Sequence, residues 1–238
     1  MPEFVEIWIY LSSEPLTWLA ATLAAYALGD AAFRAAGRKP YVNPVLIAVA
    51  LLAGLLWLTA TPYGTYFEGA QFVHFMLGPA TVSLAVPLYL NLGRVREAAL
   101  PMLAALVAGA VTAIASALGI AWALGVRGET LLSLAPKSAT APVALGISEQ
   151  IGGSPTLTAV LVILTGITGA VVATPLLNAL GIRDWRARGF ATGVAAHGIG
   201  TARAFQVNET AGAFAGVGMG LNALLTAALA PMVIRAFL

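Results

Sequence analysis

Hydrophobic residues fill the chain in long runs, and short breaks of Pro, Gly and charged residues separate these runs. The core of a bilayer is roughly 30 Å thick, so a helix that crosses it needs about 20 apolar residues. The runs predict helical segments at 15–33, 45–60, 71–90, 97–124, 130–149, 156–180, 188–205 and 211–237. We therefore expect an all-α polytopic membrane protein with seven or eight transmembrane segments, built as a single transmembrane domain over residues 1–238.

Composition supports the membrane as the solvent of this chain. Of the 238 residues 60% are hydrophobic and 9% are charged, whereas soluble domains carry about a quarter charged residues. The net charge of +2 then reports loop orientation, and no nucleic-acid partner is expected. The chain has no cysteine, which excludes disulfides and thiolate metal sites. We expect no metal and no cofactor. The N-terminal stretch carries Glu3, Glu6 and Glu14 and does not resemble a cleaved signal peptide.

Positive charges indicate which loops face the cytoplasm. Lys and Arg gather in the loops at 34–39, 94–96 and 183–188. If segment 130–149 crossed the membrane, loop 183–188 would lie outside, against this rule. A re-entrant segment, which dips in and returns on the same side, removes the conflict; such backbone must be covered by protein or line a water-filled cavity. The alternative, a full crossing with a misleading charge bias, stays open.

The two halves of the chain share an ordered set of short matches. "NPVLIAV" at 43–49 corresponds to "SPTLTAV" at 154–160, and each half then has a His followed by a Gly-x-x-Thr motif. With the orientation above, the two repeats, 43–125 and 154–238, run in opposite directions through the membrane. Inverted repeats with interrupted helices are typical of secondary transporters.

Helix-breaking residues predict interruptions near 78–87 and 193–203. Proline removes a backbone donor, and glycine weakens a helix but permits unwound backbone. The expected breaks are at Pro79, Pro87, Pro136, Pro142 and Gly200. For single glycines such as Gly109 and Gly193, close helix packing is an equal alternative.

Ionisable residues in apolar segments are costly, at about 2.5 to 3.5 kcal/mol near the bilayer centre, and mark candidate sites. Lys137, with the hydroxyls of Ser138 and Thr140 beside it, is expected to bind a small anion, most plausibly a carboxylate. The alternative is a side chain that extends to the interface.

The glycine-rich segment around His197 predicts a second set of binding groups. His197 suits a substrate donor or proton carrier, because imidazole titrates near neutral pH; the alternative is a neutral core histidine. Gly198 and Thr201 are expected to line the same site. Arg203 joins them if the helix unwinds, or instead pairs with Glu209 at the membrane edge.

Hydroxyls near the first predicted break complete the expected substrate-binding set. Thr81 and Ser83 offer hydrogen bonds to a ligand, although bonding back to the preceding helical turn is an equal alternative. No catalytic residue is expected: the adjacent Lys137 and Ser138 diverge by about 100° on a helix, and the motifs of hydrolases, metalloproteases and nucleotide-binding enzymes are missing.

Long stretches of the chain resemble the LrgB/CidB family. The similarity is carried by "FMLGPATVSLAVPLY" (75–89), "LAPKSATAPVALGISEQIGG" (134–153), "TLTAV" (156–160), "AAHGIGTARAF" (195–205) and "GAFAGVGMGLNALLTAALAP" (212–231), and it covers about residue 43 to the C-terminus. The chain departs from many relatives at Gln206-Val207-Asn208, where an acidic residue is common, so no role is carried over to an acid there.

The resemblance implies two functions. One is an antiholin-like or holin-like regulator of murein hydrolase export and cell lysis. The other is transport of small monocarboxylates: plant relatives move glycolate and glycerate across the plastid envelope, and bacterial relatives are linked to pyruvate uptake with an LrgA-like membrane partner. Because repeats, broken helices and buried cations suit a carrier, we expect a secondary transporter of glycolate, glycerate, lactate or pyruvate, with or without proton coupling. We place it in the bacterial inner (cytoplasmic) membrane as a homodimer.

Overall fold

The computed structural model describes residues 14–39, 41–83, 86, 89 and 92–237. Within these ranges all regular secondary structure is helical, which confirms the all-α prediction. The chain divides into two compact units, Met1–Val82 and Ser83–Leu238, and each is described by itself.

The first unit contains α2, α3, α4 and nearly all of α5, with the bounds Pro15–Ala35, Pro44–Leu58, Tyr63–Phe75 and Leu77–Ser83. Its centre is Trp18, which is buried against Tyr66 with the ring centroids 5.9 Å apart. Close helix contacts depend on glycine: a Cβ on Gly29 would lie 2.5 Å from the Pro44 carbonyl oxygen. Small residues thus bring the backbones of α2 and α3 together, as is usual between helices in lipid.

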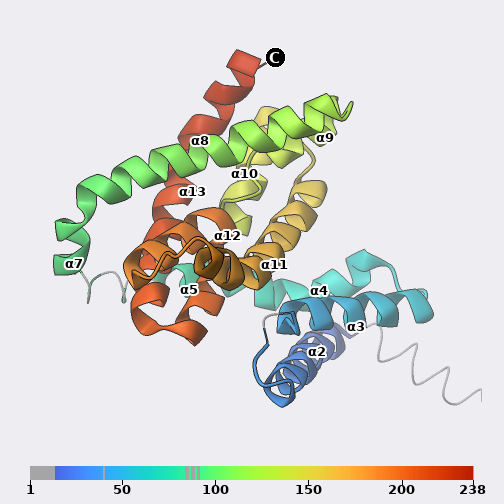
Figure 1. Ribbon diagram of the computed structural model, residues 1–238. Coiled ribbons are helices and arrows are strands. Elements are labelled where there is room, and N and C mark those ends of the chain that lie inside the picture. Colours follow the sequence, from blue (N-terminus) through green and yellow to red (C-terminus); the bar gives the residue numbers. More distant parts are fainter. Residues whose placement is uncertain (1–13, 40, 84–85, 87–88, 90–91, 238) are drawn as a thin grey trace, which may run out of the picture. The chain divides into compact units, whose positions relative to one another are not determined.

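The second unit holds the remaining helices, α7 to α13 (Figure 1). Their bounds are Leu92–Glu97, Ala99–Ala123, Gly128–Leu134, Ala141–Ile151, Pro155–Ala179, Trp185–Val207 and Glu209–Phe237. The long helix α8 runs from α7 at one end to α9 at the other (Figure 1). Helices α12 and α13 pack against α8, while α11 packs against α12, and α10 packs against α11 and α13.

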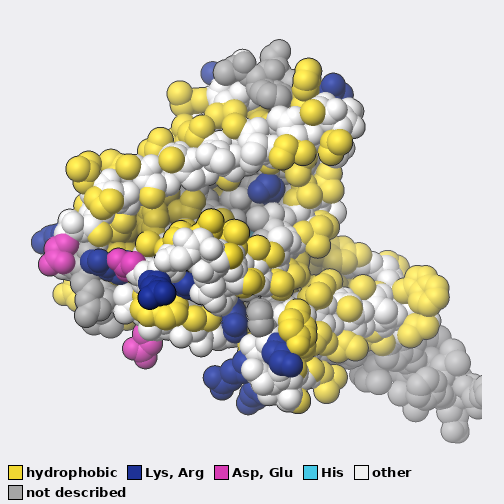
Figure 2. Space-filling view, in the orientation of Figure 1, with side chains coloured by type: hydrophobic (Ala, Val, Ile, Leu, Met, Phe, Trp, Pro, Cys, Tyr) yellow, Lys and Arg dark blue, Asp and Glu magenta, His cyan; other side chains and the backbone are white. Residues whose placement is uncertain are grey.

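Helix length and surface both fit a bilayer. Within the described residues, four helices (α2, α8, α11 and α13) are long and apolar enough to cross a membrane, and α3 is a shorter apolar helix of 15 residues. Many large hydrophobic side chains are exposed, such as Leu100 and Leu224, and they cover much of the visible surface (Figure 2). A polytopic membrane protein hides such surface in lipid.

An interruption lies just before the first region predicted to be broken. Helix α4 ends at Phe75 and α5 begins at Leu77, so the helix is interrupted at Met76, and residues 78–83 of the predicted region are helical. Pro79 is the third residue of α5, where a helical N–H has no intrahelical partner and proline is tolerated. Pro87 lies outside the described residues.

The strongest repeat match corresponds to equivalent helix starts. The Asn43 side chain accepts the N–H groups of Val45 and Leu46 and caps α3, while the Ser154 hydroxyl accepts the N–H of Leu157 and caps α11. In both helices proline occupies the first turn, where its fixed φ suits helix initiation. The inverted repeats over 43–125 and 154–238 stay a prediction.

The segment that was predicted to re-enter forms a helical hairpin of two short helices, α9 and α10. Turns at 135–138 separate them, with Pro136 in the turn and Pro142 in the first turn of α10. The N–H of Ser154, just after the hairpin, donates to Ser133 Oγ near the end of α9 at 2.8 Å. The segment is thus two short helices joined by a turn rather than one long helix, and its re-entrance into the membrane stays a prediction.

The second predicted interruption is inside α12, at Ala196 and His197, which have non-helical backbone angles. Gly200 is not the break: it lies in the regular helix beyond it, where a Cβ would meet the Ala196 Cβ at 2.6 Å. Gly193 is a packing residue, since its Cβ would lie 2.0 Å from the Ala215 carbonyl oxygen of α13. This confirms the packing alternative for Gly193.

Candidate functional site

The tip of the hairpin holds the cation that the sequence singled out. Lys137 is half-buried, and its ammonium donates to the Ser138 hydroxyl at 3.3 Å. Among the described residues this is its one hydrogen bond, and none of their carboxylates forms an ion pair with it. An ammonium has three donors, and a partly buried charge normally finds an opposite charge. The tip is therefore suited to receive an anion.

Helix α13 fixes the tip from the other side. The buried Asn222 side chain donates its amide to the Ser138 carbonyl at 3.0 Å, and its Oδ1 accepts from the Thr226 hydroxyl at 3.4 Å. Because amide groups in apolar surroundings need partners, Asn222 anchors the turn next to Lys137. Asn222 and Ser138 are 84 residues apart in the chain.

The base of the hairpin is tied by a buried hydroxyl network. Thr158 of α11 donates to the Ser133 carbonyl at 3.1 Å and is hydrogen-bonded to the Ser148 hydroxyl at 2.7 Å. Ser133 Oγ also donates to the Glu129 carbonyl at 2.7 Å. Ser133, Ser148 and Thr158 have no exposed surface, so α9 and α10 are joined to α11 through groups that satisfy one another.

The break in α12 is packed against α11. His197 has φ 40° and ψ −135°, a region that costs a residue with a side chain about 1–3 kcal/mol and that surrounding contacts must hold. Two contacts hold His197 in this conformation: its Nε2 lies 2.8 Å from the Val162 carbonyl oxygen, and the Thr201 hydroxyl donates to the His197 carbonyl at 2.7 Å. Gly166 of α11 provides the space for the imidazole ring, since a Cβ at this position would lie 2.7 Å from the His197 ring.

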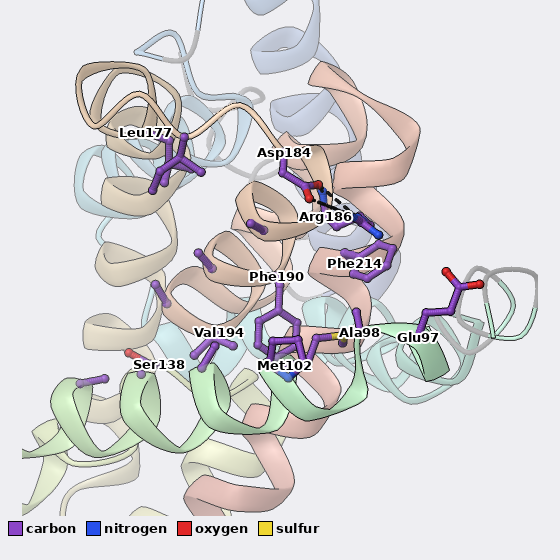
Figure 3. A pocket seen from close by; sticks show the side chains of 18 of the residues that line it. Glu97, Ala98, Met102, Ser138, Leu177, Asp184, Arg186, Phe190, Val194 and Phe214 are labelled. Atoms are coloured by element: carbon purple, nitrogen blue, oxygen red, sulfur yellow. Dashed lines mark hydrogen bonds and ion pairs between the residues drawn. The ribbon is translucent and has the colours of Figure 1, made fainter. Parts of the chain in front are cut away.

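A cavity of about 730 Å³ opens between α8 and the first half of α12; we name it the α8–α12 cavity. Ser138 lies at one end of its lining, and Glu97, Asp184 and Arg186 lie away from it at the other (Figure 3). Lys137, next to Ser138 in the chain, also lines the cavity. The side chains that line the cavity between these ends are apolar, and most of them are small. They are Met102, Ala105, Gly109, Ala113, Phe190, Val194 and Ala195. Arg186 and Ala195 are nine residues apart on α12, which corresponds to about 14 Å along the axis.

A second cavity of about 480 Å³ lies between α11 and α12, and we name it the α11–α12 cavity. It is lined by Thr165 and Thr168 of α11, by Ala196 at the break, and again by Lys137. Lys137 thus borders the spaces on both sides of the first half of α12, and it is the charged residue that they share.

The far end of the α8–α12 cavity carries an ion pair. Asp184 accepts from the Arg186 side chain at 2.9 Å and from its backbone N–H at 2.8 Å, so it also caps α12 (Figure 3). The hydrogen bonds from Arg186 hold the pKa of the Asp184 carboxyl below its ordinary value. Glu97, at the end of α7, adds a second carboxylate to this end of the cavity. We name this charged end, formed by Glu97, Asp184 and Arg186, the mouth of the cavity.

The structure brings together some of the predicted site residues. Lys137 and Ser138 meet at the tip, and Thr140 is buried there as the N-cap residue of α10. His197 and Thr201 meet at the α12 break, with Gly198 between them. The break touches the α11–α12 cavity through Ala196.

The other predicted binding residues are Arg203, Thr81 and Ser83. Arg203 lines a separate cavity of about 20 Å³ with Arg188 and Thr192, and its guanidinium donates to Gln206 at 3.3 Å. Thr81 belongs to α5 in the first unit, and the exposed Ser83 begins the second unit. Their predicted contacts with a ligand stay predictions.

Sequence reasoning missed Asn222 and the hydroxyl network of Ser133, Ser148 and Thr158. A signal was available for Asn222: it is an amide within "GVGMGLNALLTAALAP", an otherwise apolar run, and polar groups in such helices mark contacts with neighbours. Small hydroxyl residues are common in membrane helices, so Ser133, Ser148 and Thr158 could not be distinguished in the sequence as residues that join helices.

Comparison with known proteins identifies the family. The sequence profile of the LrgB-like family matches residues 22–236. The chain belongs to the LrgB-like family. It is 38% identical to the uncharacterized protein YwbG of Bacillus subtilis over 196 residues, which are 82% of this chain and 87% of YwbG. It is 31% identical to the holin-like protein CidB of Staphylococcus epidermidis and 30% to that of Staphylococcus aureus, each over 84% of this chain and 87% of the relative. No solved structure matches the chain.

Family and fold together establish a multi-pass membrane protein of the holin-like group. The names of these relatives describe no enzymatic activity. The part of the LrgB-family chain that the structure describes brings no three His, Asp or Glu side chains close enough to hold a metal ion. What the site offers is one cation with hydroxyl and amide neighbours at the end of an apolar cavity.

Proposed function

We propose that this LrgB-family protein is a secondary transporter of small monocarboxylates, such as glycolate, glycerate, lactate or pyruvate, in the bacterial cytoplasmic membrane. The observation that carries the proposal is the placement of Lys137. It lies at the turn between α9 and α10, and it borders an apolar cavity whose lining ends at Glu97, Asp184 and Arg186. A carrier needs such a site, reached from one side and closed from the other.

Charge placement supports an orientation for this arrangement. The short helix α7 before α8 carries Arg94 and Arg96, and Arg183 and Arg186 lie just before and in the first turn of α12. Both segments border the α8–α12 cavity, through Glu97 and Asp184. Basic loops face the cytoplasm. In the proposed orientation the cavity opens to the cytoplasm, and the hairpin closes the site from outside.

The proposed binding step uses the residues at the tip. The carboxylate of the substrate takes hydrogen bonds from the Lys137 ammonium and the Ser138 hydroxyl, and a charge-assisted bond of this kind contributes about 1.5–3 kcal/mol. Asn222 holds the Ser138 backbone in place. His197 and Thr201 hold the α12 break, whose residue Ala196 forms part of the wall of the α11–α12 cavity. The predicted roles of Thr140, Gly198, Arg203, Thr81 and Ser83 stay part of the proposal.

Uptake of labelled pyruvate and glycolate into proteoliposomes tests the proposal. We expect saturable uptake above that of protein-free vesicles, with a pH gradient as a second variable that reports proton coupling. Lack of uptake under both conditions, in vesicles that contain the chain alone and in vesicles that also contain an LrgA-like partner, would contradict it. Cross-linking in the membrane tests the proposed homodimer.

The names of the relatives favour a second candidate, a holin-like regulator of murein hydrolase export and cell lysis. A holin-like pore passes solutes far larger than pyruvate. Leakage of an entrapped fluorescent dye from the same vesicles would support the pore, whereas vesicles that retain dye while they accumulate pyruvate support the carrier.

A further inference from the structure

The α8–α12 cavity is much larger and more apolar than a three-carbon hydroxy acid requires. Sites of 300–1,000 Å³ usually bury ligands of drug-like size, and this cavity has about 730 Å³. Beyond Ser138 and Lys137, the next side chains along it are Ala, Gly, Val, Met and Phe. These groups give no hydrogen bond to the hydroxyls of glycerate, but they match an apolar chain.

The walls of the cavity are formed by one face of α8 and the facing side of α12. On α8 the lining residues Pro101, Ala105, Gly109 and Ala113 are four apart, so they form one stripe of small side chains along the helix. On α12 the larger Phe190 and Val194 face them, and Figure 3 shows both between Ser138 at one end and Arg186 at the other. The result is an apolar slot that leads from the cation towards the mouth.

The apolar walls of the slot select against a second carboxylate. Beyond Lys137 and Ser138, its described lining carries no charged side chain until Glu97, Asp184 and Arg186 at the far end, and Arg186 is already bound to Asp184. A carboxylate that enters apolar surroundings without a partner loses its hydration uncompensated. A ligand that places one carboxylate at Lys137 and ends within the slot therefore binds more weakly if its other end is also anionic.

We propose that this cavity binds monocarboxylates with an uncharged, apolar tail, branched or aromatic, more tightly than it binds pyruvate, glycolate or dicarboxylates. This inference rests on the proposed carrier function and extends its substrate class from the smallest acids to larger ones. The carboxylate binds at Lys137 and Ser138, and the tail lies between α8 and α12 against Phe190 and Val194.

A series of 2-oxo acids tests the inference by isothermal titration of the purified full chain in detergent. Pyruvate, 2-oxobutanoate, 4-methyl-2-oxopentanoate and phenylpyruvate share the carboxylate end and differ in the tail. Each buried methylene is expected to lower the dissociation constant about fourfold. 2-Oxoglutarate, which has a similar chain length with a charged end, is expected to bind at least tenfold more weakly than 4-methyl-2-oxopentanoate.

A pair of variants on α8 locates the tail. Ala105 lines the slot, while the exposed Ala104 is its neighbour on the helix outside the lining. Ala105→Leu is expected to reduce the preference for phenylpyruvate over pyruvate at least fivefold, and Ala104→Leu is expected to leave it unchanged. Equal effects of the two variants would overturn the placement of the tail.

The outcomes separate this inference from the proposed function. Affinities that are flat or that fall with tail length, together with saturable pyruvate uptake, overturn the inference and leave the carrier intact. If none of the acids binds and none is taken up, both proposals fail. Tight binding of phenylpyruvate without its transport supports the inference, because the compound then inhibits pyruvate uptake at the same site.

Discussion

The base and the tip of the α9–α10 hairpin both contain polar groups, but these groups differ in how fully they are hydrogen-bonded within the protein. At the base, Ser133, Ser148 and Thr158 are fully buried and hydrogen-bond to one another and to backbone. At the tip, Lys137 has one weak hydroxyl neighbour among the described residues and borders two cavities. A closed network holds a fold together, whereas a cation with unused donors beside a cavity is available to a ligand.

The largest expected effect is at the tip. Lys137→Met removes the charge but keeps most of the side-chain volume, and we expect pyruvate uptake to fall about 10- to 100-fold, since a charge-assisted hydrogen bond contributes about 1.5–3 kcal/mol. The melting temperature should change little, because no ion pair with another described residue is lost. Lys39→Met, at an exposed lysine of the first unit, is the control. Normal uptake by Lys137→Met would make Lys137 an interface anchor.

Next in size is a change at the base. Thr158→Val removes the hydroxyl that bonds Ser133 and Ser148, and we expect the free energy of unfolding to fall by about 1–3 kcal/mol. The measurement is thermal unfolding in detergent, compared with Thr156→Val at an exposed site two residues earlier. The KM of the protein that remains folded should stay constant. A raised KM without loss of stability would mean that the base takes part in binding.

A smaller effect is expected where the tip is anchored. Asn222→Leu removes the amide that bonds the Ser138 carbonyl, and the net loss of a neutral hydrogen bond, about 0.5–1.5 kcal/mol, corresponds to about a two- to tenfold change. Because Asn222 positions the tip, we expect this change mainly in the KM for pyruvate. An unchanged KM, with reduced stability alone, would make Asn222 a purely structural residue.

The smallest effect is expected at the mouth, where the groups are exposed. Asp184→Asn keeps a side chain that caps α12 but removes the charge that pairs with Arg186. Since the folded-state pKa of Asp184 is depressed, its contribution is present above the ordinary pKa of an aspartate and is lost as the pH falls through the folded-state pKa. The difference in melting temperature between wild type and Asp184→Asn should therefore be present at neutral pH and disappear in acid. A difference that persists in acid would assign the effect to packing.

Much of the helical framework could be predicted from local sequence. Asn43-Pro44 and Ser154-Pro155 begin helices because a capping side chain and a fixed φ act within a few residues. Pro79 does not break the helix as predicted, because proline is tolerated in the first turn of α5, and the interruption within the described residues of this region is at Met76. The break in α12 was found in the right segment but at His197, since contacts with Val162 and room at Gly166 on α11 decide its position.

The sequence by itself determined that the protein is helical and embedded in a membrane, and that Lys137 is a polar residue in an unusual place. Long apolar runs, caps and a single lysine in a hydrophobic segment are local features, and local chemistry is sufficient to interpret them. Only the tertiary structure decided that Lys137 faces cavities and that Asn222 holds its turn. It also separated Arg203 from Lys137. Such contacts join helices far apart in the chain, and their formation depends on how small residues let those helices approach.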